Sequence, residues 1–136
     1  MRMVFLDTAP LIYLLEGAEN RRKVVHEQLL AWTNHGASFG TSALTLMEVM
    51  IHPKKRGDVI MQGRYRSLLS EFVAGHIMPV SESVAEKAAE YRALLGLRTP
   101  DALQLACAVV NGYDTFYTND RRLRRVTEIT IELVDA

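Results

Sequence analysis

Short apolar runs alternate with longer stretches of helical spacing along the whole chain, and this alternation constrains the fold more than any other feature. The apolar runs are too short for helices, so we expect strands at Met3–Leu6, Ser38–Thr41, Ile77–Val80, Thr115–Tyr117 and Ile129–Val134. Helical segments separate each strand from the next, and this order predicts a parallel sheet. We therefore expect an α/β fold in which a central parallel sheet is flanked by helices on both faces.

Capping residues predict where the helices between these strands begin and end. Ser83 and Glu86 have the spacing of a capping box, and Pro53 is expected to close the helix that Ser42 opens. The expected helices run from Leu11 to Glu16, from Asn20 to about Asn34, from Ser42 to Pro53, from about Asp58 to Ala74, from Ser83 to Gly96 and from Thr99 to Val110, and Asp120 starts a short helical turn.

The composition is that of a single folded domain over residues 1–136. Hydrophobic residues make up 49% of the chain and charged residues 24%, which is enough to build a core. The formal net charge is zero, so any surface that binds nucleic acid must be local. The single cysteine, Cys107, excludes an internal disulfide and a multi-cysteine zinc site. The chain shows no signal peptide and no membrane-length apolar run, which predicts a cytoplasmic protein without membrane contact.

Four acidic residues occupy positions that are expected to face the sheet edge or the core. Asp7 follows the first strand and Asp120 the fourth, so both should lie at the carboxyl edge, where parallel sheets bind ligands. Asp101 lies in the first turn of the most apolar helix. Glu48 is the one charged residue in the otherwise apolar run Ala43–Ile51, which we expect to be buried.

Each of these acids alone has an ordinary structural explanation. Asp7 and Asp120 could cap helices, and Asp101 could complement a helix dipole. A cap or a helix dipole does not explain Glu48. Because burying an unpaired carboxylate is costly, Glu48 requires a lysine or arginine partner or a functional role. A cation shared by all four acids explains the set best. Because only oxygen ligands are available, Mg²⁺ or Mn²⁺ is the expected ion, and such sites typically act on phosphate esters.

Four segments of the chain, taken in order, resemble the successive motifs of PIN-domain ribonucleases. They are MVFLDTAPLIYLLE, TSALTLMEVM, RTPDALQLACA and FYTNDRRL, and they are most similar to those of the VapC-type toxins of prokaryotic toxin–antitoxin pairs. The resemblance covers nearly the whole chain. It implies a PIN-like fold, Mg²⁺- or Mn²⁺-dependent cleavage of RNA, and inhibition by a cognate antitoxin protein.

The same resemblance implies roles for individual residues. The catalytic, metal-binding acids would be Asp7, Glu48, Asp101 and Asp120. Thr118, in the T-x-D motif, would position a water or a carboxylate by hydrogen bonding, and Thr8 is a second candidate for that role. The chain departs from the family pattern at Gln104, where many members have histidine.

Two basic clusters are expected near the proposed site and could hold RNA phosphates. Their members are Arg121, Arg122, Arg124 and Arg125 after Asp120, and Lys54, Lys55 and Arg56 after the helix that carries Glu48. Arg98, just before Thr99, has the same potential. The alternative is that these residues form solvated charged surface.

Apolar segments suggest protein partners as well as a core. We expect a homodimer, and we assign Trp32, Phe72 and Tyr91 to the core or to dimer contacts. The segments Ala43–Ile51 and Leu11–Leu15 could offer an antitoxin peptide a hydrophobic groove, or could be core or homodimer contacts.

Two rival functions remain open. An aspartate-nucleophile phosphatase would use Asp7 in FLDTA, but the general acid expected two positions later is replaced by Ala9. A non-catalytic RNA-binding module would show no metal-dependent activity. The favoured hypothesis is a toxin that acts as a Mg²⁺- or Mn²⁺-dependent endoribonuclease, in which an activated water attacks the RNA phosphodiester in line.

Overall fold

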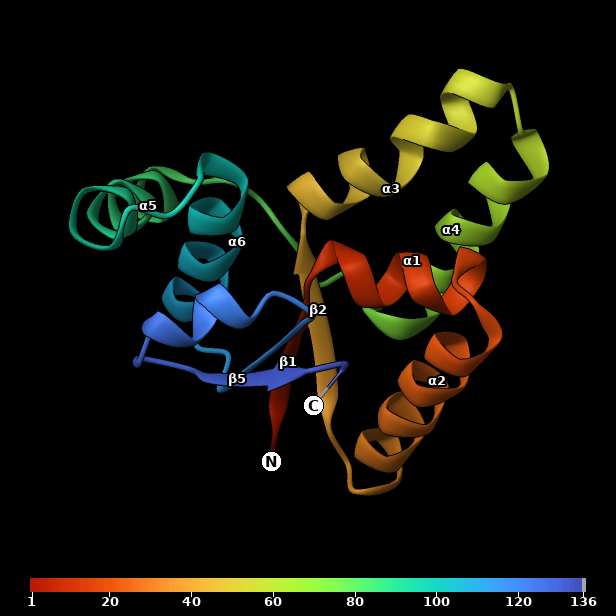
Figure 1. Cartoon of the computed structure of the whole chain (residues 1–136), viewed down its shortest axis with the longest axis horizontal. Helices are drawn as coiled ribbons and strands as arrows, with labels where there is room; N and C mark the ends of the chain where they lie inside the picture. The colour runs from red at the N-terminus through yellow and green to blue at the C-terminus, as the bar shows by residue number, and fades with distance from the viewer. Residues whose placement is uncertain (136) are drawn as a thin grey trace.

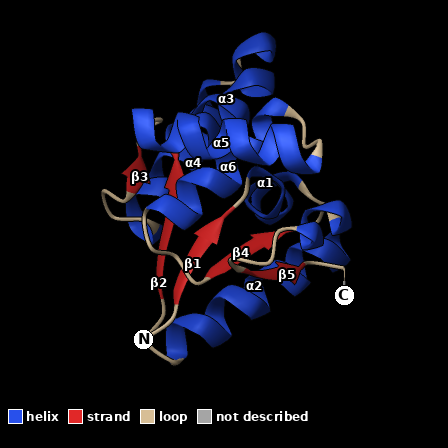
Figure 2. Ribbon diagram, turned by 90° about the vertical axis from the view of Figure 1, so that its left-hand side faces the viewer, coloured by secondary structure: helices blue, strands red, loops and turns tan. Residues whose placement is uncertain are grey.

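The computed structural model describes residues 1–135, in which five parallel strands form one sheet. The strands are β1 (Met3–Leu6), β2 (Ser38–Ser42), β3 (Ile77–Met78), β4 (Thr115–Thr118) and β5 (Thr130–Leu133). Their order across the sheet is β3-β2-β1-β4-β5. The expected α/β fold with a central parallel sheet is therefore confirmed (Figure 2).

Helices on both faces of the sheet connect the strands. They are α1 (Thr8–Glu16), α2 (Glu19–Asn34), α3 (Ala43–Arg56), α4 (Val59–Phe72), α5 (Glu82–Leu95), α6 (Thr99–Val110) and the 3₁₀ turn η1 (Arg121–Arg125). In Figure 1, α5 and α6 lie on one side of the sheet and α1, α2 and α4 on the other. Within residues 1–135, no helix is both long and apolar enough to cross a membrane.

The path of the chain explains where a site should form. The chain runs from β1 to β2 and β3 in one direction and then returns past β1 to β4. Because crossovers between parallel strands are right-handed, the two directions place their helices on opposite faces. Strands β1 and β4 are neighbours at the point where the strand order reverses, and open parallel sheets bind ligands at the carboxyl ends of such strands.

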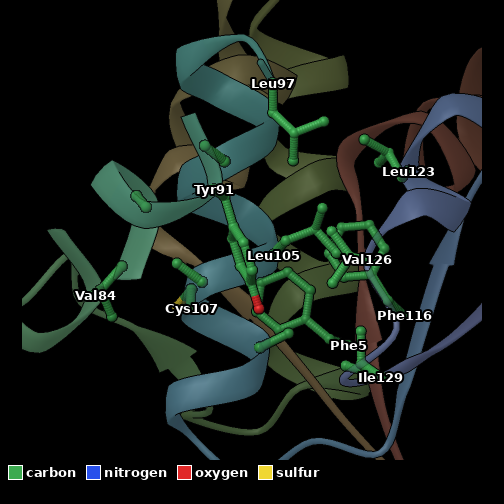
Figure 3. Close-up of a cluster of buried hydrophobic side chains, with 14 of the residues drawn as sticks. Phe5, Val84, Tyr91, Leu97, Leu105, Cys107, Phe116, Leu123, Val126 and Ile129 are labelled. Atoms are coloured by element: carbon green, nitrogen blue, oxygen red, sulfur yellow. The ribbon is translucent and has the colours of Figure 1, made fainter. Parts of the chain in front are cut away.

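Alternate residues of β1 face two separate hydrophobic clusters. Val4 and Leu6 pack with residues of α1–α4, whereas Phe5 packs beneath α5 and α6. Phe5 and Phe116 stack with 5.4 Å between ring centroids and lie beside Leu105 of α6 (Figure 3). Each face of the sheet therefore has its own core, and the ends of β1 and β4 are held between the two.

Helix α3 differs from the expectation in length and in burial. It continues through Pro53 and ends at Gly57, whose φ of 65° lies in the left-handed region. The proline occupies the last turn, where it removes one intrahelical hydrogen bond without ending the helix. The run Ala43–Ile51 is also only partly buried: Met47 is 52% exposed and Ile51 is 40% exposed, because helical spacing turns one face to the core.

The predicted ends of two other elements were wrong. Ser81, not Ser83, caps α5, because the Ser81 Oγ accepts the backbone N–H of Val84 at 3.3 Å. Ser83 therefore lies inside the helix. The strand β3 stops at Met78, before the expected Val80.

The large aromatic residues assigned to the core or to a dimer contact pack within the single chain. Trp32 is 8% exposed and Tyr91 is 4% exposed. Phe72 is half-buried and packs edge-on against Phe39, with 5.5 Å between ring centroids. Burial within the single chain accounts for all three residues.

Candidate active site

A cleft of about 440 Å³ lies at the carboxyl ends of β1 and β4. The residues singled out from the sequence that line it are Asp7, Thr8, Glu48, Arg98, Asp101, Gln104, Thr118 and Asp120. They come from four distant parts of the chain: the end of β1, the middle of α3, the start of α6 and the end of β4. The fold therefore brings all four predicted acids and Thr118 to one cleft.

Three hydrogen bonds hold the carboxylate of Asp7. It caps α1, which begins at Thr8 and not at the expected Leu11, and its Oδ1 accepts the Thr8 N–H at 2.8 Å. Thr118 Oγ1 donates to Oδ2 at 2.8 Å, and Gln104 Nε2 donates to Oδ1 at 3.3 Å. Three donors from three elements therefore fix the orientation of this carboxylate.

The pKa of Asp7 is raised to about 6, mainly because burial removes water from its carboxylate. The hydrogen bonds from Thr118 and Thr8 lower this pKa, and the charges of Asp101 and Glu48 raise it. At neutral pH the side chain is mostly ionised but poorly solvated. A cation bound in the cleft would stabilise that charge.

Glu48 is half-buried on α3 and accepts a hydrogen bond from Thr8 Oγ1 to Oε1 at 2.6 Å. Among the described residues, no lysine or arginine forms a salt bridge with it. The ion-pair explanation that the sequence left open is therefore not realised within residues 1–135. Partial exposure to the cleft lowers the cost of keeping this carboxylate charged.

Asp101 and Asp120 each contact an arginine of the same segment. Arg98 Nε lies 3.2 Å from Asp101 Oδ2. Arg122 binds Asp120 with two bonds, Nε to Oδ1 at 3.0 Å and Nη2 to Oδ2 at 2.7 Å. The hydrogen bond from Arg122 lowers the pKa of Asp120, against the effect of burial. The two outer acids thus already have positive partners, unlike Glu48.

The donor set fits a hard divalent cation in its chemistry, since the cleft offers carboxylate and hydroxyl oxygens. Within residues 1–135, however, no three acidic, histidine or cysteine side chains are grouped closely enough to hold an ion as they stand. Asp7, Glu48 and Asp101 are near enough for their charges to raise the pKa of Asp7. A shared ion site would need Asp101 and Asp120 to lie closer to Asp7 and Glu48 than they do here.

Comparison with known proteins places this architecture in a family. No curated protein sequence matches the chain. The family model described as the PIN domain matches residues 4–129, a span that includes all four acids of the cleft. The chain belongs to the PIN-domain family.

Solved structures of toxin–antitoxin proteins share the fold of this PIN domain. A toxin–antitoxin complex from Klebsiella pneumoniae is 26% identical, with 96% of this chain and 97% of that chain covered and a TM-score of 0.76. VapBC2 from Rickettsia felis, bound to a DNA fragment from its promoter, is 15% identical, with coverages of 96% and 98% and a TM-score of 0.76. The sarcin–ricin loop cleaving toxin VapC20 from Mycobacterium tuberculosis is 18% identical, with coverages of 83% and 86% and a TM-score of 0.65.

Unlike the four acids, most of the basic residues that the sequence singled out do not line the described cleft of the PIN domain. Lys54, Lys55 and Arg56 lie at the end of α3 remote from the ends of the central strands (Figure 1). Arg121 Nη2 donates to the backbone carbonyl of Asp135 at 3.0 Å. Of the basic residues that the sequence singled out, the described lining of the cleft includes only Arg98.

A buried polar network behind the PIN-domain acids was missed at the level of sequence. Thr45 was not singled out, yet it contacts Gln104, which in turn contacts Asp7. Helical spacing could have identified this network. Thr45 precedes Glu48 by three positions, and Gln104 follows Asp101 by three. Each polar residue therefore shares a helix face with an acid of the cleft.

Proposed function

We propose that this PIN domain is a metal-dependent endoribonuclease that acts as the VapC-type toxin of a toxin–antitoxin pair. The observation that carries the proposal is the convergence of Asp7, Glu48, Asp101 and Asp120 in one cleft at the strand-order reversal. The similarity in fold to toxin–antitoxin complexes, at 26% identity for the Klebsiella pneumoniae complex, supports the biological role.

The residues of the cleft would hold the ion and orient the RNA. Asp7, Glu48, Asp101 and Asp120 would bind Mg²⁺ or Mn²⁺, which when bound polarises a phosphoryl oxygen and lowers the pKa of a water. Thr118 holds one oxygen of Asp7 through its hydroxyl and accepts the backbone N–H of Asp120 at 3.2 Å. It therefore links two of the acids, which suits the positioning role proposed for it.

Arg98 at the cleft and exposed arginines of η1, which follows the cleft residue Asp120, would hold the RNA backbone. Arg98 lines the cleft and is 68% exposed, so it can turn from Asp101 to a phosphate with little loss of packing. Arg124 and Arg125 are exposed, and neither forms a salt bridge within residues 1–135. We include these three arginines in the proposed RNA-binding surface.

A second hollow fits a protein partner. A groove of about 520 Å³ lies between α3 and α4, and we call it the α3–α4 groove; its lining residues are Leu46, Met47, Met50, Ile51, Lys54, Val59, Gln62, Gly63 and Arg66. We propose that the antitoxin places an apolar segment here, with acidic side chains toward Lys54 and Arg66. A basic side chain of the same partner would reach the acidic cleft and compete with the cation.

The location of this groove revises one expectation. The run Ala43–Ile51 lines this groove opposite α4, whereas Leu15 of the segment Leu11–Leu15 lines a separate hollow with α4 residues such as Leu68. Leu11 is 1% exposed and belongs to the core beneath the sheet.

The proposed activity is tested by incubating the purified protein with total cellular RNA and with a sarcin–ricin loop hairpin. We expect endonucleolytic fragments in the presence of Mg²⁺ or Mn²⁺, no fragments in EDTA, and recovery when Mn²⁺ is restored. RNA binding without cleavage under every metal condition would instead favour the non-catalytic module. Hydrolysis of a phosphomonoester would favour the phosphatase, although Ala9 lines the cleft where that enzyme needs an acid.

A further inference from the structure

Gln104 is a buried polar residue in α6, a helix that is apolar after its first turn except for this residue. It lies on α6, three positions after Asp101, and its side chain is 2% exposed. Both ends of its amide are hydrogen-bonded to side chains of other elements. Such a residue is costly to bury unless each polar atom has a partner, and here each one does.

The Asp7 carboxylate fixes which way the Gln104 amide points. An ionised carboxylate can only accept, so the amide atom that faces Asp7 Oδ1 is Nε2, and Oε1 accepts the hydroxyl hydrogen of Ser42. With Oε1 engaged as an acceptor, Nε2 points toward Thr45 Oγ1 at 2.6 Å and toward Asp7 Oδ1 at 3.3 Å. The amide therefore donates both of its hydrogens toward the cleft side of the network.

A second branch of this network leads to Glu48. Thr8 Oγ1 and Thr45 Oγ1 lie 3.3 Å apart, and because the single hydroxyl hydrogen of Thr8 goes to the shorter bond with Glu48, the hydrogen between the two threonines is that of Thr45. Thr8 Oγ1 in turn donates to Glu48 Oε1 at 2.6 Å. One amide thus reaches Asp7 directly and Glu48 through two hydroxyl groups.

We infer that Gln104 is a positioning residue that holds the carboxylates of Asp7 and Glu48 in the arrangement that binds the divalent cation. The inference rests on the proposed function, because the cation belongs to that proposal. The two carboxylates come from different elements and carry like charges. Thr8 contacts both from the side of α1, through its backbone N–H to Asp7 and its hydroxyl to Glu48, and Gln104 supplies the link from the buried side of the cleft. Partners of this kind behind metal ligands typically change metal affinity by about 10–100-fold when they are removed.

The test measures Mn²⁺ binding to the metal-free protein in the absence of RNA, by calorimetry or by electron paramagnetic resonance of free Mn²⁺. Gln104→Met keeps the volume and removes the amide, and we expect it to raise the Mn²⁺ dissociation constant by about 10-fold or more. Thr45→Val removes the branch to Glu48 and one acceptor of the Gln104 amide but keeps the bond from Gln104 to Asp7, so its effect should be smaller. The double variant should bind as weakly as Gln104→Met alone, because both changes break one network.

The matched control is Asn111→Ala at the opposite end of α6. Asn111 Nδ2 donates to the Cys107 carbonyl at 2.7 Å, so this change also removes one amide hydrogen bond from the helix, but far from the acids. It should lower thermal stability and leave Mn²⁺ affinity unchanged. Thr45→Val supplies the decisive measurement if Gln104→Met fails to fold.

Two results would overturn the inference in distinguishable ways. If the wild type binds Mn²⁺ and cleaves RNA, and Gln104→Met binds Mn²⁺ equally well while losing thermal stability, then Gln104 is purely structural and the proposed function stands. If the wild type neither binds Mn²⁺ nor cleaves RNA, both the inference and the proposed function are wrong.

Discussion

At the scale of single residues, the most informative group in the cleft is Asp7, because burial makes the charge of its carboxylate unfavourable. Its carboxylate has three hydrogen-bond donors, yet its pKa is raised from 3.8 to about 6 because burial outweighs them. The folded chain therefore keeps a proton on Asp7 over a pH range in which the unfolded chain has lost it. Without metal, Asp7 should therefore make stability fall as the pH rises from about 4 to about 6.

We predict that Asp7→Asn stabilises the metal-free protein at neutral pH. Between about pH 4 and pH 6 the folded state binds more protons than the unfolded state, so the free energy of unfolding of the wild type falls as pH rises. The loss reaches about 2–3 kcal/mol above pH 6. Asp7→Asn should remove this loss of unfolding free energy at higher pH. The control Asp114→Asn, at an exposed position, should leave the loss in place. Urea unfolding in EDTA from pH 4 to pH 8 checks the prediction, and parallel curves for wild type and Asp7→Asn would contradict it.

A second single-residue prediction concerns Tyr117 on β4. Its Oη is buried without a hydrogen-bond partner within residues 1–135, and its ring packs edge-on to Trp32 with 4.9 Å between centroids. Tyr117→Phe should therefore raise the free energy of unfolding by about 1 kcal/mol, since it removes an unsatisfied polar atom. Tyr65→Phe is the matched control, because the Tyr65 hydroxyl donates to Glu16 at 2.5 Å and its loss should destabilise. Denaturant unfolding of both variants decides the matter, and a less stable Tyr117→Phe would show that the hydroxyl has a partner.

At the scale of elements, the sequence predicted which helices and strands exist better than where they end. The helix ends that were right had a strong local signal, as at Gly96, which caps α5 in the left-handed conformation. The errors arose where two signals competed. Pro53 looked like a terminator, but Gly57 ends α3; Ser83 looked like a cap, but Ser81 is the cap. Local sequence spacing cannot show which of two nearby residues will end or cap a helix in the folded protein.

The exposed face of α3 leads to a prediction about the antitoxin. Met47 is 52% exposed and lines the α3–α4 groove, so Met47→Glu should fold normally but weaken antitoxin binding by about 10-fold or more, because it places a charge in an apolar contact. Leu94→Glu on α5 is the control, since Leu94 is 74% exposed and lies on the opposite face of the sheet. Affinity for the protein encoded by the adjacent small reading frame is the measurement. Equal affinity of Met47→Glu and the wild type would exclude the groove as the docking site.

At the scale of the whole molecule, the parallel sheet and the meeting of Asp7 and Asp120 could be predicted from chain order, whereas Glu48 and Asp101 were added by the shared-cation argument and the family resemblance. Acids placed after β1 and β4 must share the carboxyl edge of a parallel sheet. The contacts of those acids could not be predicted. Arg98 and Asp101 have i,i+3 spacing, which permits a pair without requiring one, and the pairing of Arg122 with Asp120 depends on the local turn after β4.

The central claim is that the carboxylates of this cleft form the catalytic ion site of a ribonuclease, and Asp101→Asn tests it most directly. Asp101 is 19% exposed, lines the cleft and caps no helix, so the change removes a charge without removing a fold contact other than its bond to Arg98. The measurement is the RNA cleavage rate at saturating Mn²⁺, with circular dichroism to verify folding and Asp114→Asn as the surface control. We predict a loss of about 100-fold or more for Asp101→Asn and none for Asp114→Asn. A folded Asp101→Asn protein that cleaves RNA at the wild-type rate would contradict the claim.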